Sequence, residues 1–374
     1  MNWRLLAIPA SIVPLLLMLI FTRISPEDIF AVGAIPFVIS CVSVMGRILL
    51  QAYRFKYFIR EFIGRDISST ANTVSARLAG EFVTQTTPSY VGGELVRIAW
   101  LTKKGVPAGR AAWLATMEII ADVLVGTMLG FIAGAIAIYN GAAFIGIIVI
   151  LIAIPTFVFW LVLIIFSAKR TLRLPSFSLT LVQKFIAKER AERGINSINN
   201  AIADLCKMSR ANFNSINAIR TFTVGIAITF VAFLFQGLSF MVLANAVGSD
   251  IGLFDSLMAT SASTVLATLP VTIGGSGLAE LGLWAYVSDL NSIPHLDDVL
   301  KDSQLSVIIV WRIASYHVPL VIMWIALMRT IGKGPLKDTK TSPFSPLVSE
   351  EDKVDQSESL SDQEKKNDRS DIFG

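Results

Sequence analysis

The stretch AAFIGIIVILIAIPTFVFWLVLIIF, residues 142–166, runs for 25 residues without a charged side chain. At about 1.5 Å per residue, a helix of this length crosses a hydrocarbon core that is roughly 30 Å thick. The composition agrees, since 53% of the 374 residues are hydrophobic and only 16% are charged. Soluble domains carry roughly 25% charged residues. The sequence therefore predicts a polytopic α-helical membrane protein.

Five further apolar runs are long enough to cross a bilayer. They are residues 5–21, 30–50, 111–139, 218–247 and 303–328. The first run follows Arg4 and has no small-residue cleavage site before Arg23, so we expect a retained signal anchor. The predicted fold class is all-α, with about six spanning helices.

Lys and Arg are concentrated in three of the connections between these runs. Positive residues collect in cytoplasmic loops, and this bias sets the orientation of the chain. The basic connections are the loop after residue 50 with Arg54 and Lys56, the stretch before residue 111, and residues 167–217. The other connections are acidic or neutral. We therefore expect a multi-pass protein of the cell membrane with both termini in the cytoplasm.

Two segments, residues 71–96 and 256–287, do not fit this topology as spans. They carry the same helix-breaking pattern, TPSYVGGE at 87–94 and LPVTIGGS at 269–276. Proline removes a backbone donor, and a glycine pair permits the reversed dihedrals of a tight turn. We predict two re-entrant helical hairpins, a form tolerated only where the backbone is buried or lines a cavity. The predicted breaks are Pro88, Gly92, Gly93, Pro270, Gly274 and Gly275.

From the distribution of Lys and Arg, we expect the first hairpin to enter the membrane from the cytoplasm and the second from outside. The first hairpin and the spans on either side of it thus mirror the second hairpin and its two flanking spans. Breaks at corresponding positions of two inverted halves indicate the substrate site of a transporter. The alternative is that Pro and Gly are simply common in membrane helices.

Several charged residues fall in or beside apolar segments, where they are costly unless they face a cavity or a partner. Two interpretations stay open: a polar groove that binds a phosphate and a cationic group, or internal salt bridges that join helices. For Arg97 the alternative is a side chain that extends to the interface. The candidate substrate-binding residues are Glu94, Arg97, Glu118, Asp122, Glu280 and Arg312.

The sequence contains no P-loop, nucleophile elbow or dinucleotide fingerprint. Its two His and two Cys residues are not at ligand spacing, which argues against a transition-metal site. We expect no cofactor, no metal and no nucleic-acid partner.

Outside the spans, residues 168–217 place apolar residues at helical spacing among basic ones, which predicts an amphipathic helix on the inner leaflet. A soluble helical hairpin is the alternative. Residues 333–374 are rich in Ser, Asp, Glu and Lys, and we expect a disordered cytoplasmic tail. The membrane domain is therefore expected to cover residues 1–332.

The stretch EFVTQTTPSYVGGELVRIAWLTKKGV, residues 81–106, resembles the lysylphosphatidylglycerol synthase transmembrane family. This family includes the flippase half of the bacterial multiple peptide resistance factor. Residues 270–280 resemble its second motif, and Trp311 and Arg312 with Pro319 resemble its last helix. The likeness extends over residues 1–332 and implies a flippase-type membrane domain.

One motif departs from the family pattern. The family has Glu-Arg-x-x-Asp in the third span, whereas this chain has EIIAD at residues 118–122. The missing arginine means that a lysyl-lipid substrate does not carry over with the resemblance. The soluble aminoacyltransferase domain of the synthases also has no counterpart here, so we expect no synthase activity.

These observations favour a lipid translocase rather than an enzyme. The expected cargo is a phospholipid with an anionic or zwitterionic head group, or a polyprenyl-phosphate-linked lipid. One alternative is a membrane glycosyltransferase that uses polyprenyl-phosphate sugars, with Asp297 and Asp298 as its acidic pair. Another is a membrane scaffold that transports nothing. A homo-oligomer is compatible with each of these functions.

The topology predicts which positions an impermeant thiol reagent reaches in intact cells. In a variant without the two native cysteines, we expect labelling of a cysteine placed near Asp250 or Asp297, but not near Lys104 or Lys188. Labelling near Lys104 from outside would contradict the two-hairpin topology.

Overall fold

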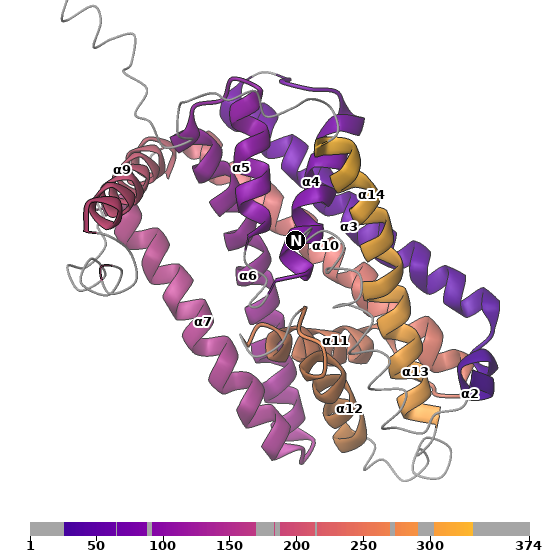
Figure 1. The fold of residues 1–374 in the computed structure, drawn as a ribbon. Coiled ribbons are helices and arrows are strands. Elements are labelled where there is room, and N and C mark those ends of the chain that lie inside the picture. Colours follow the sequence, from indigo (N-terminus) through magenta and orange to yellow (C-terminus); the bar gives the residue numbers. More distant parts are fainter. Residues whose placement is uncertain are drawn as a thin grey trace, which may run out of the picture. The chain divides into compact units, whose positions relative to one another are not determined.

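The structure, a computed structural model, describes residues 26–64, 66–87, 92–169, 183, 188–213, 215–269, 274–290 and 303–331. Within these ranges the chain forms helices and turns and contains no strand. The chain divides into two compact units, one of residues 1–173 and 202–337 and one of residues 174–201 and 338–374. The candidate site lies in the first unit, which Figure 1 draws with its helices labelled.

Five helical stretches in the described residues are long and apolar enough to cross a membrane. They confirm the predicted runs 30–50, 111–139, 142–166, 218–247 and 303–328, with shifted ends. The run 5–21 lies outside the described residues. A short helix, α2 (Pro26–Ala31), precedes the first of the five. The five are α3 (Ala34–Ile63), α6 (Ala108–Tyr139), α7 (Ala143–Lys169), α10 (Ile216–Ala246), and α13 (Ser303–Arg312) continued by the π-helix η1 (Ile313–His317) and α14 (Val318–Ile331).

Helix α3 continues well past residue 50, so the prediction of a basic loop there is wrong. The helix ends only at Gly64, which adopts a left-handed conformation with φ of 76°. Beyond residue 50, Phe55 and Phe58 are buried in the core and keep the helix packed. Arg54 lies on this extension and is fully buried, which makes it an interior residue rather than a marker of the cytoplasmic surface.

The two segments that do not fit the topology as spans, residues 71–96 and 256–287, each form a pair of short helices. Their lengths of 11 to 16 residues correspond to about 16–24 Å, less than the thickness of a hydrocarbon core. Figure 1 shows α4 and α5 toward the upper end of the first unit and α11 and α12 toward the lower end. The pairs are α4 (Thr70–Gln85) with α5 (Gly93–Lys103), and α11 (Leu253–Ala267) with α12 (Leu278–Leu290).

Which side of a membrane each helix pair enters stays a prediction. Pro88 and Pro270 lie outside the described residues, so their part in the breaks stays a prediction as well.

The glycines of the two breaks act differently. Gly92 has a φ of 118°, and Gly274 and Gly275 have φ values of 59° and 64°, as expected for reversed turns. Gly93 instead belongs to α5, so the prediction of a reversed dihedral is wrong for it. A Cβ on Gly93 would lie 2.2 Å from the carbonyl oxygen of Gly80. This glycine is required because α4 and α5 pack backbone to backbone.

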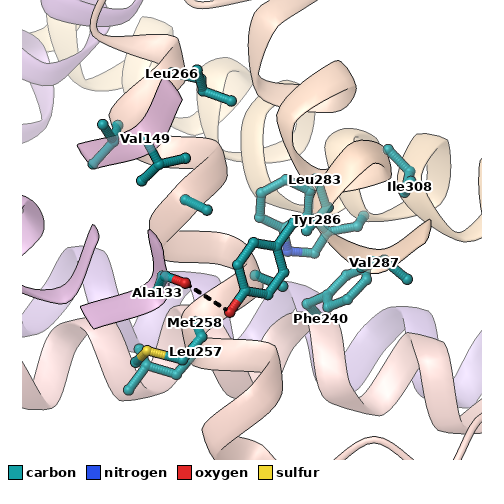
Figure 2. Close-up of a cluster of buried hydrophobic side chains, with 14 of the residues drawn as sticks. Ala133, Val149, Phe240, Leu257, Met258, Leu266, Leu283, Tyr286, Val287 and Ile308 are labelled. Carbon is teal, nitrogen blue, oxygen red and sulfur yellow. Dashed lines mark hydrogen bonds between the residues drawn. The ribbon is translucent and has the colours of Figure 1, made fainter. Parts of the chain in front are cut away.

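A buried apolar cluster holds α11 and α12 against the long helices. Figure 2 shows Tyr286 of α12 among Leu257 of α11, Phe240 of α10 and Val149 of α7. The Tyr286 hydroxyl donates to the carbonyl oxygen of Ala133 in α6, at 3.3 Å. The second helix pair is thus fixed mainly by apolar packing.

Of the segment 168–217 that was predicted to be amphipathic, residues 168 and 169 belong to α7, and residues 188–213 form α9 (Lys188–Phe213). Its residues 188–201 belong to the second unit, whereas residues 202–213 belong to the first. At this latter end, the hydroxyls of Ser209 and Ser167 lie 3.1 Å apart, and Met208 packs against the buried cluster that contains Phe58 and Trp113. Attachment of α9 to a lipid leaflet stays a prediction.

Helices α6 and α7 also cross at glycines. A Cβ on Gly134 would lie 2.9 Å from the carbonyl oxygen of Gly146 and 2.7 Å from the side chain of Ile150. We expect Gly134→Ala to lower the free energy of unfolding by about 1–3 kcal/mol, because an overpacked contact must shift. The measurement is the thermal unfolding midpoint in detergent, with Gly194→Ala as the matched control, since no atom lies within 4 Å of that position. Equal midpoints for the two variants would contradict the close crossing.

Candidate functional site

One face of α3 carries polar residues into the interior. Arg47, Gln51 and Arg54 follow one another at i, i+4 and i+7, the spacing of a single helix face. A guanidinium nitrogen of Arg47 donates to the side-chain oxygen of Gln236 in α10, at 2.5 Å. The amide of Gln51 donates to Asp122 in α6, at 3.3 Å. This face therefore joins α3 to both α6 and α10 by polar contacts.

Glu118 of α6 is shared by three arginines from three different helices. Its carboxylate lies 2.7 Å from Arg97 of α5, 3.3 Å from Arg77 of α4 and 3.5 Å from Arg54 of α3. The side chains of Glu118 and Arg54 are both 0% exposed. A buried charge without a partner is strongly destabilising, so this carboxylate holds the four helices in one arrangement.

Two further carboxylates complete the network. Asp122 forms a pair with Arg54 at 2.7 Å and lies 3.9 Å from Arg77. Glu81 forms an ion pair with Arg77 one turn away on α4 and accepts a hydrogen bond from Gln85. Three carboxylates thus face three guanidinium groups, which compensates the charges of this cluster.

A separate ion pair, between Glu280 and Arg312, joins α12 to α13. Arg312 lies 2.7 Å from Glu280 and donates to the carbonyl oxygen of Gly274 at 2.6 Å. Its guanidinium also lies 4.2 Å from the centre of the Tyr316 ring, a cation–π contact. Glu280 in turn accepts a hydrogen bond from the backbone N–H of Gly277. These contacts fix the turn between α11 and α12.

Glu94 has a different environment from the other candidate carboxylates. It lies in the first turn of α5, and its carboxylate accepts a hydrogen bond from the backbone N–H of Gly92 at 3.0 Å. A carboxylate in the first turn of a helix is favoured by the helix dipole. Its side chain is partly exposed and lines the cavity described next.

A cavity of about 570 Å³ lies between the two helix pairs. Its other walls come from α3, α6, α7, α10, α13 and η1. One part of the wall is apolar, formed by Ile119, Val123, Ile152, Trp160 and Phe233. The charged residues that line it are Arg47, Arg77, Glu81, Glu94, Arg97, Asp122 and Arg312.

The six residues selected from the sequence fall into two groups. Glu94, Arg97, Asp122 and Arg312 line the cavity. Glu118 and Glu280 do not line it, but each forms an ion pair with an arginine that does. Arg97 is 4% exposed and bound to Glu118, and so it does not extend to the interface.

Sequence reasoning missed several residues that line the cavity. Arg47 and Gln51 lie in or beside an apolar run, and their spacing on one helix face was the available signal. Gln236, Thr264 and Tyr316 carry no comparable signal, since neutral polar residues are ordinary in membrane helices.

Asp297 and Asp298, the acidic pair of the enzyme alternative, lie outside the described residues. Among the described residues, no group of three or more His, Cys, Asp or Glu side chains is arranged to hold a metal ion.

Membrane-crossing helices, broken short helices and a charged cavity between them define a polytopic α-helical membrane protein. The sequence model for the lysylphosphatidylglycerol synthase TM region matches residues 6–322 of the chain. The chain belongs to this family, which confirms the resemblance found in its motifs. No curated protein matches the chain.

The shared carboxylate predicts a large effect of one substitution. We expect Glu118→Gln to lower the free energy of unfolding by about 3–5 kcal/mol, because buried arginines lose their compensating charge. The matched control is Glu61→Gln, which removes an exposed ion pair with Arg60 and costs about 0–1 kcal/mol. Chemical unfolding in detergent measures both, and a Glu118→Gln protein as stable as the Glu61→Gln protein would contradict the role of Glu118.

Proposed function

We propose that this protein is an integral membrane lipid translocase. Its cargo is a phospholipid with an anionic or zwitterionic head group, or a polyprenyl-phosphate-linked lipid, which it moves between leaflets. The observation that carries the proposal is the charged cavity between two broken helix pairs within a membrane domain. Broken helices around a charged interior site are the arrangement that transporters use to bind substrates at membrane depth.

The main obstacle to moving a lipid between leaflets is the free-energy cost of placing its charged head group in the hydrocarbon core, and the cavity lowers this cost. A charged group costs roughly 2.5–3.5 kcal/mol at the centre of a spanning helix on insertion scales, and a lipid head group meets a similar barrier. Within the cavity, Arg97 and Arg312 offer guanidinium groups, which match phosphate geometry in two parallel hydrogen bonds. The apolar wall with Val123 and Phe233 suits the first carbons of the lipid tail.

The balance of charges favours passage over retention. Arg97 is already paired with Glu118, and Arg312 with Glu280. A phosphate therefore meets arginines whose charge is partly neutralised, and it binds more weakly than it would to an isolated cation. Weak binding is what transport requires, because the head group must leave as readily as it enters.

Family membership supports a lipid as the ligand, because the family is described by a lipid synthase membrane region. The departure from the family motif falls at Ile119, which lines the cavity as an apolar residue. We therefore propose that the head group differs from lysylphosphatidylglycerol. The distribution of Lys and Arg supports a cell-membrane protein with both termini in the cytoplasm.

The test uses purified protein in liposomes that contain a fluorescent anionic phospholipid, with dithionite to report which leaflet holds it. We expect the protein to accelerate movement of the fluorescent phospholipid between the two leaflets. We expect the paired variant Arg312→Gln with Glu280→Gln to slow exchange about tenfold, equivalent to about 1.4 kcal/mol of barrier. Both charges are removed together so that neither is left buried and unpaired.

The matched control is Arg329→Gln, an exposed arginine in the last turn of α14. This variant should exchange lipid at the rate of the unmodified protein. If the paired variant folds and still moves lipid at the full rate, Arg312 does not bind the head group. If the unmodified protein moves neither this probe nor a polyprenyl-phosphate probe, the translocase function is wrong.

A further inference from the structure

The last spanning stretch contains a local change of helix type at the cavity wall. Residues Ile313–His317 form a π-helix, in which the backbone N–H of Val318 donates to the carbonyl oxygen of Ile313. Pro319 follows and has no N–H to donate, so a regular α-helix would lose a bond at this place. Single π-turns of this kind occur frequently at functional sites.

This π-turn directs Tyr316 to the first helix pair. The Tyr316 hydroxyl donates to the carbonyl oxygen of Gln85, the last residue of α4, at 2.9 Å. The side chain is 2% exposed, and its ring lies under the guanidinium of Arg312. Tyr316 is therefore bound to one helix pair by its hydroxyl and to Arg312 by its face.

The second helix pair meets the same point. Arg312 donates to the carbonyl oxygen of Gly274, at the turn before α12. A Cβ on Gly274 would lie 2.5 Å from the Tyr316 hydroxyl oxygen and 2.6 Å from the Gln85 carbonyl oxygen. The end of α4 therefore lies against Gly274 in the turn before α12. Both lie against Tyr316 of the π-turn.

We propose that Tyr316 is a positioning residue. Its hydroxyl acts as a clasp that holds together the tips of the two helix pairs, residues 84–87 of the first pair and 274–280 of the second. Its ring orients Arg312 toward the cavity. Release of the clasp separates the tips and extends the cavity past them. The hydrogen bond from Tyr316 to Gln85 and the cation–π contact with Arg312 are each weak enough to break and re-form during each transport cycle. The part of the proposal that concerns transport rests on the proposed function, whereas the part that concerns the tips does not.

The first test is amide hydrogen exchange of the full-length protein in detergent, without added lipid. We expect Tyr316→Phe to raise the exchange rate about tenfold at residues 84–87 and 274–280, since the variant loses only the hydroxyl. Tyr286→Phe is the matched control. It removes an equally buried hydroxyl that is bound to the backbone carbonyl of Ala133, as Figure 2 shows, and not to either tip.

The two variants should differ in where exchange rises. Faster exchange at both tips in Tyr316→Phe but not in Tyr286→Phe supports the clasp. Unchanged exchange at the tips in Tyr316→Phe, or a uniform rise over the whole membrane domain, overturns it.

The second test separates the hydroxyl from the ring in liposomes. We expect Tyr316→Phe to keep the affinity for the anionic phospholipid probe and to raise its exchange rate severalfold, because the tips part more readily. Tyr316→Leu also removes the ring beneath Arg312 and should weaken affinity severalfold. A purely structural tyrosine would lower the rate and the stability together in both variants.

The results distinguish this inference from the proposed function. If Tyr316→Phe loosens the tips but the unmodified protein moves no lipid, the clasp stands and the translocase function fails. If the Tyr316→Phe and unmodified proteins move lipid at the same rate and also show the same amide hydrogen exchange at the tips, the clasp is wrong. The translocase function then stands.

Discussion

The cost of an unpaired charge in a low-dielectric interior governs this structure. Arg54, Arg77 and Arg97 approach the middle of the first unit from three helices, and Glu118 makes this arrangement tolerable by pairing with all three. The position of α5 therefore follows from a carboxylate on α6. Without that carboxylate, α5 would bury Arg97 without the ion pair that compensates its charge.

The two helix pairs reach their positions by different forces. The first pair is held by ion pairs with Glu118 and Asp122 of α6, and its own helices meet at Gly80 and Gly93. The second is held by apolar packing around Tyr286 and Leu257, with one ion pair to α13 (Figure 2). Similar break motifs in the sequence thus give similar helix pairs, although the forces that fix them differ.

Much of the fold was predictable from the sequence, because apolar runs and glycine breaks are local signals. The prediction of a loop at Arg54 is wrong because a basic residue marks the surface only where solvent reaches it, whereas Phe55 and Phe58 beside Arg54 keep this part of α3 helical and buried. For the site, charges in apolar surroundings identified Arg97 and Arg312. The partners were not predictable, since the bond from Tyr316 to Gln85 joins residues that are 231 positions apart.

The sharing of Glu118 has a consequence for how this sequence is able to change over evolutionary time. Three arginines share Glu118, so the effect of replacing any one of these four residues depends on the other three, and for Arg54 and Arg77 also on Asp122 and Glu81. A lineage that loses one arginine alters the charge balance felt by the other two. Divergence at these four positions is therefore expected to proceed in concerted steps, while Ile119 next to them, which pairs with nothing charged, is free to change with the cargo.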